Sequence, residues 1–150
     1  MYDKNMKYLG KIILIEHDDG LRHPFIILWE SKTKTIALLC SSVLYDNDKN
    51  EYSIFYADWY KDQKNKSPDI VDLDSTDGLK FNSQVDLNII YIFDKQELNL
   101  NNIKNELKFD TYVSLINRLV NKEFQNKETN EMLEAAYKNM LLIQNKKRKL

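Results

Sequence analysis

Two pairs of polar residues stand at the ends of apolar runs, in places where they could act on a phosphate ester. Arg22 and His23 come just before one run, and Ser41 and Ser42 come just after another. A histidine can donate or accept a proton near neutral pH. An arginine can stabilise negative charge on a phosphate, and hydroxyl groups can hydrogen-bond its oxygens. An ordinary hairpin tip with two strand-end hydroxyls would contain the same residues, so residue type alone leaves both interpretations open.

Short apolar runs rich in β-branched and aromatic residues predict the strands that would position these pairs. The first runs span residues 8–15, 24–29 and 35–40 and are joined by polar turns. Three consecutive strands with short connections predict an antiparallel meander, the usual beginning of a small barrel or sandwich. A further core strand is predicted at 84–93, and residues 52–56 are a weaker candidate.

After about residue 101 the period of the apolar residues changes from two towards 3.6, which predicts helices. Asp110 and Thr111 are suited to cap the N-terminus of a helix that runs through Phe124. A second helix is predicted from about Thr129 into the 140s, and the segment 103–107 would add one helical turn before these two.

The length and composition are those of a single globular domain. The chain has 150 residues, of which 43% are hydrophobic and 11% aromatic, which is enough to bury a core. We therefore expect one α+β domain over residues 1–150, with a β core at about 8–93 and a helical part at about 101–146. No apolar segment approaches the roughly 20 residues of a membrane span, and the first residues lack the pattern of a signal peptide. A soluble cytoplasmic protein is the expectation.

The sequence contains no pattern typical of a metal or cofactor site. Cys40 is the single cysteine, which excludes a disulfide framework and a four-ligand zinc site built from cysteines within the chain. The two histidines, His17 and His23, have no third ligand at a suitable spacing. The acidic stretch 72–78 misplaces the glycine and the last ligand of a calcium-binding EF-hand loop, so we expect a solvated acidic loop there. No metal and no cofactor are predicted.

The net charge of −1 does not indicate nucleic-acid binding, but the distribution of charge permits it. Residues 138–149 contain five cations and no acidic residue. This basic end could contact RNA, or it could be a solvated helix end, the commoner explanation of such a cluster.

Four short motifs occur in an order that is similar to a known family. A glycine opens the first strand at 10–14, and a polar turn with cationic residues leads into a proline and the second strand at 20–27. The third strand ends in a hydroxyl pair at 38–42, and a polar-then-apolar strand follows at 87–93. The chain resembles the PemK/MazF-like endoribonuclease toxins. The long terminal helices are more similar to the RNA-antagonised branch, the ToxN/CptN/AbiQ-like toxins of type III toxin–antitoxin systems.

Two residues depart from the pattern of this family. The cation immediately before the proline, an arginine or lysine in the family, is His23 here, with Arg22 one residue earlier. The threonine of the hydroxyl pair is Ser41. Either Arg22 or His23 could therefore do the work that the family gives to one cation.

The resemblance implies an α+β fold with a small antiparallel SH3-like, PemK-type β-barrel core and C-terminal helices. It implies a toxin that cuts RNA without a metal ion, by attack of a 2′-hydroxyl on the adjacent phosphorus to leave a 2′,3′-cyclic phosphate. On this hypothesis His23 exchanges a proton, Arg22 stabilises the phosphorane, and Ser41 and Ser42 hydrogen-bond phosphate oxygens. The candidate RNA-binding residues are Lys11, Lys80, Ser83, Asn88, Lys146, Lys147 and Arg148.

The implied partners are a substrate RNA and a structured, pseudoknot-like repeat antitoxin RNA that assembles with the toxin into a closed heteromeric complex. The sequence leaves one alternative open: a non-catalytic small β-barrel interaction module that binds protein or RNA, with the helices as a docking surface.

Overall fold

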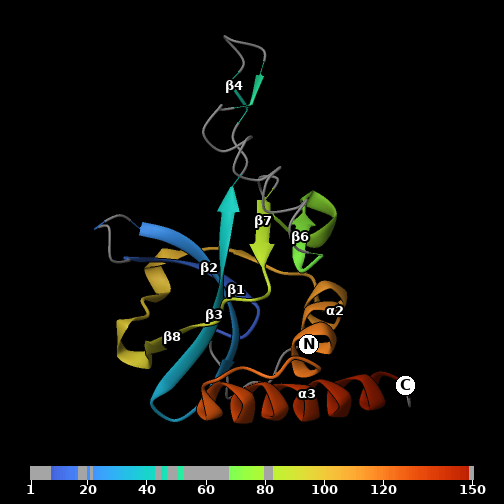
Figure 1. Ribbon diagram of the computed structural model, residues 1–150. Helices are drawn as coiled ribbons and strands as arrows, with labels where there is room; N and C mark the ends of the chain where they lie inside the picture. Colours follow the sequence, from blue (N-terminus) through green and yellow to red (C-terminus); the bar gives the residue numbers. More distant parts are fainter. Residues whose placement is uncertain are drawn as a thin grey trace.

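The computed structural model describes residues 8–16, 20, 22–42, 45–46, 51–52, 68–79 and 83–148 (Figure 1). Within these ranges, only the backbone is described for residues 41–42, 45–46, 51–52, 100 and 147–148. The elements in chain order are β1 (Lys11–Glu16), β2 (Arg22–Glu30), β3 (Lys34–Ser42), β4 (Tyr45–Asp46), β5 (Glu51–Tyr52), β6 (Ile70–Leu73), the 3-10 helix η1 (Ser75–Asp77), β7 (Ser83–Asp86), β8 (Tyr91–Asp94), η2 (Lys95–Glu97), η3 (Leu100–Asn102), β9 (Ile103–Glu106), α2 (Phe109–Val120) and α3 (Lys127–Arg148).

An antiparallel sheet of seven strands forms the centre of the described fold. Its order is β6-β7-β3-β2-β1-β9, and β8 pairs with β3 as well, while β4 and β5 form a separate two-stranded sheet. The α+β class is thus confirmed. The predicted β-barrel core is not observed as a closed barrel, because within the described residues the sheet is open, with β6 and β9 at its two edges.

The predicted strand at 84–93 is in fact two strands, β7 and β8, that pair with successive stretches of β3. Between them the chain turns at Asp86, whose carboxylate accepts the backbone N–H of Asn88 over 2.9 Å. Such a local side-chain bond is a turn-forming feature of aspartate. The turn buries Leu87 completely and exposes 47% of Ile89.

The residues predicted to form an extra helical turn at 103–107 instead form β9, the edge strand that pairs with β1. The two helices follow as expected, but with other ends. α2 begins at Phe109, one residue before the predicted cap, and ends at Val120. α3 begins at Lys127, where the side chain of Asn126 accepts the backbone N–H of Thr129 over 3.1 Å. The predicted strand at 52–56 coincides with β5 only at residue 52, and its remainder lies outside the described residues.

The predicted acidic loop at 72–78 is ordered. It contains the end of β6 and then η1, which begins with a capping box: Asp74 accepts the backbone N–H of Thr76, and the carboxylate of Asp77 accepts the backbone N–H of Asp74. This reciprocal arrangement satisfies donors that a helix start leaves open. The structure therefore uses these carboxylates as local caps.

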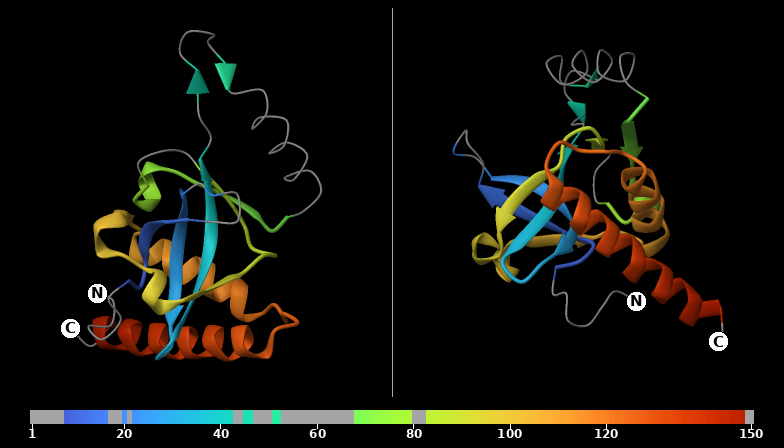
Figure 2. Two further views of the ribbon diagram at one scale, coloured as in Figure 1. Left: turned by 90° about the vertical axis from the view of Figure 1, so that its left-hand side faces the viewer. Right: turned by 60° about the horizontal axis from the view of Figure 1, so that its bottom comes forward.

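The sheet has an apolar cluster on each face. The larger cluster lies between the sheet and the two helices, which gather on one side of it (Figures 1 and 2). The smaller cluster lies on the opposite face, which we call the outer face; its sheet residues include Ile13, Phe25, Ile27 and Ala37. Among the described residues, no helix is long and apolar enough to cross a membrane.

Candidate functional site

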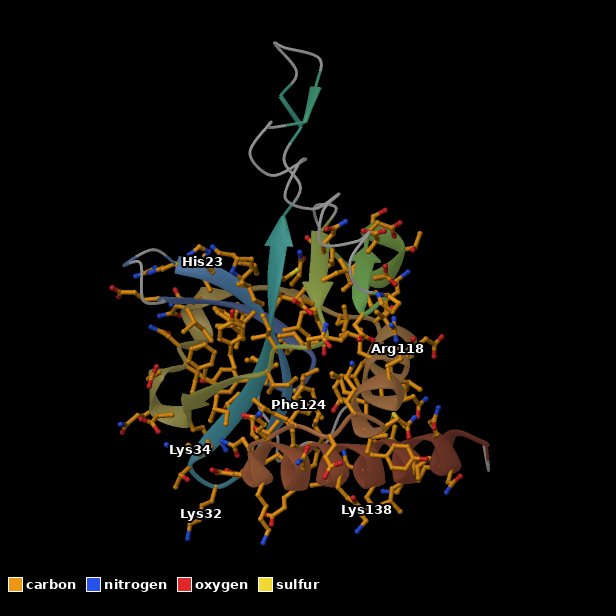
Figure 3. All side chains as sticks on the ribbon, viewed as in Figure 1. His23, Lys32, Lys34, Arg118, Phe124 and Lys138 are labelled. Carbon is orange, nitrogen blue, oxygen red and sulfur yellow. The ribbon has the colours of Figure 1, made fainter. Side chains whose placement is uncertain are left out.

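The first predicted pair, Arg22 and His23, lies at the start of β2, where it pairs with Glu16 and Ile15 of β1. Figure 3 shows His23 at the end of the sheet that lies away from α3. Arg22 is exposed and His23 is half-buried. Successive residues of a strand lie on opposite faces, so the pair does not share a face. His23 falls on the outer face with Phe25, two residues further along β2.

The second pair, Ser41 and Ser42, lies at the end of β3 and pairs with β7 on the next strand of the sheet. The ladder between β2 and β3 ends at the rung Phe25–Leu39. Both predicted pairs therefore lie beyond this last rung, at the same end of two neighbouring strands (Figure 1). The backbone brings the two pairs into one region.

The predicted RNA-binding residues are spread over the surface. Lys11 forms an ion pair with Glu106 of β9 over 3.1 Å, and Asn88 accepts a hydrogen bond from Lys122 over 3.1 Å. Lys146 is exposed in the last turns of α3, the helix that carries Lys138 across the far end of the molecule from His23 (Figure 3). Lys80 lies outside the described residues, and for Lys147 and Arg148 only the backbone is described.

Ser83 differs from the other candidates because it is only 4% exposed. Its hydroxyl interacts with the thiol of Cys40 on β3. Burial raises the pKa of the Cys40 thiol above its ordinary value, and the hydrogen bond with Ser83 acts in the opposite direction. The prediction for Cys40, a small buried hydrophobic residue, agrees with its 3% exposure.

A small apolar cleft of about 90 Å³ opens on the outer face beside the predicted site. Leu39 of β3 lines it, and the ring of Tyr91 from β8 lines it as well. The cleft forms where the turn between β7 and β8 interrupts the pairing with β3, so it follows from the Asp86 turn. Its other lining residues are Ile70, Gln84, Val85, Asp86 and Ile89.

Aromatic neighbours hold the ring of Tyr91 in place. Phe25 meets it edge-on with ring centroids 5.3 Å apart, and Phe93 stacks with it at 6.5 Å. Phe25 and Phe93 are themselves in edge contact at 4.9 Å. Edge-to-face and offset-stacked contacts at these distances are favourable. Tyr91 therefore enters the cleft from a rigid aromatic cluster, and Phe25 joins this cluster to the strand that carries His23.

A hydrogen bond fixes the orientation of the Gln84 side-chain amide at the cleft. Its Nε2 donates to the Asp72 carboxylate over 2.7 Å. A carboxylate accepts hydrogen bonds only, so the amide nitrogen must face Asp72 and the Oε1 atom must face away. That oxygen is buried and accepts no hydrogen bond from the part of the chain that the structure describes. An unsatisfied buried acceptor costs about 1–3 kcal/mol, so a ligand group that donated a hydrogen bond to this oxygen would be favoured.

The β6 side of the cleft is anchored to helix α2 by an ion-pair cluster. Lys122 and Arg118 contact the carboxylate of Asp69 at 2.8 and 3.6 Å. The backbone carbonyl of Asp69 also accepts the N–H of Leu87 over 3.0 Å. These contacts fix the segments that lead into β6 and out of β7, and they neutralise two cations close to the cleft.

The cleft residues were not singled out in the sequence, although Gln84, Asp86 and Tyr91 lay inside a predicted strand. The available signal was the polar alternation of Gln84 and Asp86 around Val85, which places two polar side chains on one face.

Within the described ranges, no three histidine, cysteine, aspartate or glutamate side chains are grouped so that they could hold a metal ion. The sequence matches no protein-family model, and no curated protein is significantly similar to it.

Proposed function

We propose that the protein is a cytoplasmic toxin of a toxin–antitoxin system that cuts RNA without a metal ion. One observation carries the proposal: His23 and the Tyr91 cleft share the outer face of the sheet. Phe25 connects them, because its ring contacts Tyr91 at 5.3 Å and it lies two residues from His23 on the same strand. A proton-exchanging group beside a rigid aromatic cleft is suited to a single-stranded RNA, whose bases can stack on aromatic rings.

The proposed reaction is an attack of a ribose 2′-oxygen on the adjacent phosphorus. The 2′-hydroxyl loses its proton, the bond to the 5′-oxygen of the next nucleotide breaks, and that oxygen gains a proton. The products are a 2′,3′-cyclic phosphate and a free 5′-hydroxyl. His23 exchanges the proton, and Ser41 and Ser42 enter the proposal through their place at the end of β3. Arg22, exposed at the neighbouring position of β2, is assigned to phosphate contact at the rim.

A backbone contact between the two edges of the sheet supports the same proposal at the level of the fold. Although the sheet is open, the turn after its edge strand β6 meets the end of its other edge strand β9, where Lys108 donates its backbone N–H to the carbonyl of Asp77 over 2.8 Å. We assign this half-closed arrangement to the SH3-like, PemK type. By the same resemblance, a structured repeat RNA would act as the antitoxin, in a closed assembly with the toxin.

The test uses the full chain, a single-stranded RNA and excess EDTA. Cleavage by the wild-type protein should leave ends with a 2′,3′-cyclic phosphate. The His23→Ala variant should lose about 10²–10⁴-fold in rate at saturating RNA, the usual contribution of one acid–base group. Arg22→Ala is the matched neighbour and should chiefly weaken RNA binding. Full cleavage by a folded His23→Ala protein would remove histidine from the mechanism.

The alternative, a non-catalytic binding module, is favoured by the separation of Arg22 and His23 onto opposite faces. Expression in cells distinguishes the two functions. A ribonuclease toxin should arrest growth, and a His23→Ala/Ser41→Ala version should not. A binding module should give the same growth with both versions and no cleaved RNA.

A further inference from the structure

We infer that the cleft is a base-recognition subsite that prefers cytosine or adenine to uracil, because these two bases carry an amino group where uracil carries its O4 carbonyl. The inference rests on the proposed action on RNA and names the part of the RNA that the cleft reads. It follows from the shape of the cleft, from its aromatic wall and from the hydrogen-bonding groups of its two polar side chains.

The small volume and the aromatic lining of the cleft favour a small planar group as the ligand. Its volume of about 90 Å³ is far below the roughly 300–1,000 Å³ of sites for drug-sized molecules. Tyr91 is held on one side by Phe25 and Phe93, while aliphatic side chains from Leu39, Ile70 and Ile89 complete the lining. A ring system that stacks on the fixed tyrosine would fill such a space, and stacking on an aromatic side chain is a general mode of binding unpaired bases.

The polar groups of the cleft select for a donor. Asp72 holds the amide nitrogen of Gln84, so the buried Oε1 of Gln84 can only accept a hydrogen bond. The second polar side chain of the lining, Asp86, is a carboxylate and also accepts only. Cytosine and adenine present an amino group on their Watson–Crick edge. Uracil presents a carbonyl oxygen at the corresponding position, so it can offer these two acceptors only its single N3–H, whereas an amino group offers two hydrogens.

The same charges exclude the sugar-phosphate backbone from the cleft. Asp86 lines it and Asp72 lies behind Gln84, so a phosphate there would face two carboxylates. Two cations near the β6 side, Arg118 of α2 and Lys122 just after it, are already paired with Asp69. The backbone of a bound RNA must therefore pass outside the cleft, with one base turned inward.

The experiment compares short RNAs that cannot be cut. Fluorescence anisotropy would measure the binding of 2′-O-methyl tetranucleotides of cytosine, adenine and uracil to the full chain. Cytosine and uracil are a matched pair, because the amino group of one is replaced by oxygen in the other. We expect the amino-bearing tetramers to bind about 5- to 150-fold tighter than the uracil tetramer, the range that one good base contact provides.

Three variants connect the preference to the cleft. Gln84→Leu removes the acceptor and should bring the ratio of cytosine affinity to uracil affinity close to one, chiefly by weakening the binding of the cytosine tetramer. Asp72→Asn allows the amide of Gln84 to turn over and present its nitrogen, so the preference should shrink or reverse even if Gln84→Leu is unstable. Tyr91→Ala should weaken binding of every tetramer, and Tyr91→Phe should restore it.

Equal binding of cytosine and uracil by the wild-type protein would overturn the inference, as would a preference that survives both Gln84→Leu and Asp72→Asn. The cleft could instead bind an arginine-rich peptide and lose that affinity in Gln84→Leu. This result would assign the cleft to a protein partner and would also overturn the inference of a base subsite. The proposed function fails separately. Base preference without RNA cleavage would support the subsite but not the ribonuclease, and the protein would then be an RNA-binding module. RNA cleavage without base preference would support the ribonuclease but not the subsite.

Discussion

The backbone N–H of Lys108 donates to the carbonyl of Asp77 over 2.8 Å, which joins the ends of the two edge strands of an open sheet. Asp77 follows β6 and Lys108 follows β9, strands that lie at opposite ends of the sheet order. The carboxylate of Asp77 also accepts the hydroxyl hydrogen of Thr111 in α2 over 2.7 Å. This one residue thereby links both sheet edges to the first turn of a helix.

The junction depends on a glycine, and Gly78→Ala should break it. Gly78 has φ of +101°, and an added Cβ would lie 2.6 Å from the carbonyl oxygen of Glu106. The backbone of β9 would have to move, so we expect a loss of about 3 kcal/mol in the free energy of unfolding. Gly20→Ala is the matched control, since Gly20 also has positive φ, +78°, but no described residue has an atom within 4 Å of the added one. It should lose only about 1–2 kcal/mol. Urea unfolding measures both losses. If the two variants lost equal free energies of unfolding, the close approach of the Glu106 carbonyl to position 78 would not persist in solution.

A second prediction concerns a bulge in the sheet, where the hydroxyl of Tyr112 satisfies a buried backbone carbonyl. The register between β2 and β3 shifts between Ile27 and Trp29, and Leu28 falls at this irregularity. The hydroxyl of Tyr112, a residue that is 1% exposed, donates to the carbonyl of Leu28 over 2.6 Å. Tyr112→Phe leaves that buried carbonyl without its donor and should cost about 1–3 kcal/mol. The control is Tyr137→Phe on α3, which should change thermal or urea stability by less than about 0.5 kcal/mol. A Tyr112→Phe effect no larger than the control would mean that water replaces the hydroxyl.

The sequence predicted the elements whose conformation is determined by their own local residue pattern. The apolar β-branched runs of β1, β2 and β3 are buried strands, and the apolar stripe of α2 is a helix. β9 was missed because its Ile103 and the following Leu107 have helical spacing. Its conformation is decided instead by pairing with β1, far earlier in the chain, as in the pair of Lys11 with Glu106. Tertiary contacts of this kind override local propensity.

The ends of α2 and the position of the cleft were also set by distant residues. Thr111 resembled a helix cap, but its hydroxyl is taken by Asp77, 34 residues earlier in the chain. The cleft exists because β7 and β8 pair with different stretches of β3, and no local pattern reports that register. The strand-end pairs around His23 and Ser41 were visible in the sequence because each is adjacent to a single apolar run.

A third prediction concerns acid, through the cap at Asp74. The Asp74 carboxylate accepts the backbone N–H of Thr76 at 2.8 Å and its hydroxyl at 2.6 Å, and these bonds hold its pKa below the ordinary 3.8. A lowered pKa in the folded state means that the stabilisation is complete above the ordinary value and is lost as the pH falls through the folded value. The effect is small because the carboxyl is exposed to solvent and screened.

The Asp74→Asn variant keeps one acceptor oxygen but cannot titrate in this range. Its free energy of unfolding should therefore approach that of the wild-type protein as the pH falls from about 5 to below the ordinary carboxyl pKa. Urea unfolding at several pH values measures the difference, and carbon NMR of the Asp74 carboxyl measures its pKa directly. A constant difference between the two proteins across this range would show that the cap does not depend on charge.

The last prediction separates RNA affinity from RNA chemistry at the two ends of the molecule. Lys146 lies on α3, away from the outer-face cleft, so Lys146→Ala should weaken RNA binding but leave the cleavage rate at saturating RNA unchanged. If Lys146 contacts one phosphate, the slope of log affinity against log salt should fall by about 0.7 for single-stranded RNA. His23→Ala should do the opposite, losing rate with an unchanged salt slope. Lys127→Ala is the control on the same helix, because Lys127 is near Glu131 at 4.0 Å and lies outside the terminal cluster; its slope should equal the wild-type slope. RNA affinity that is the same at low and high salt would contradict any phosphate-contacting role for this basic end.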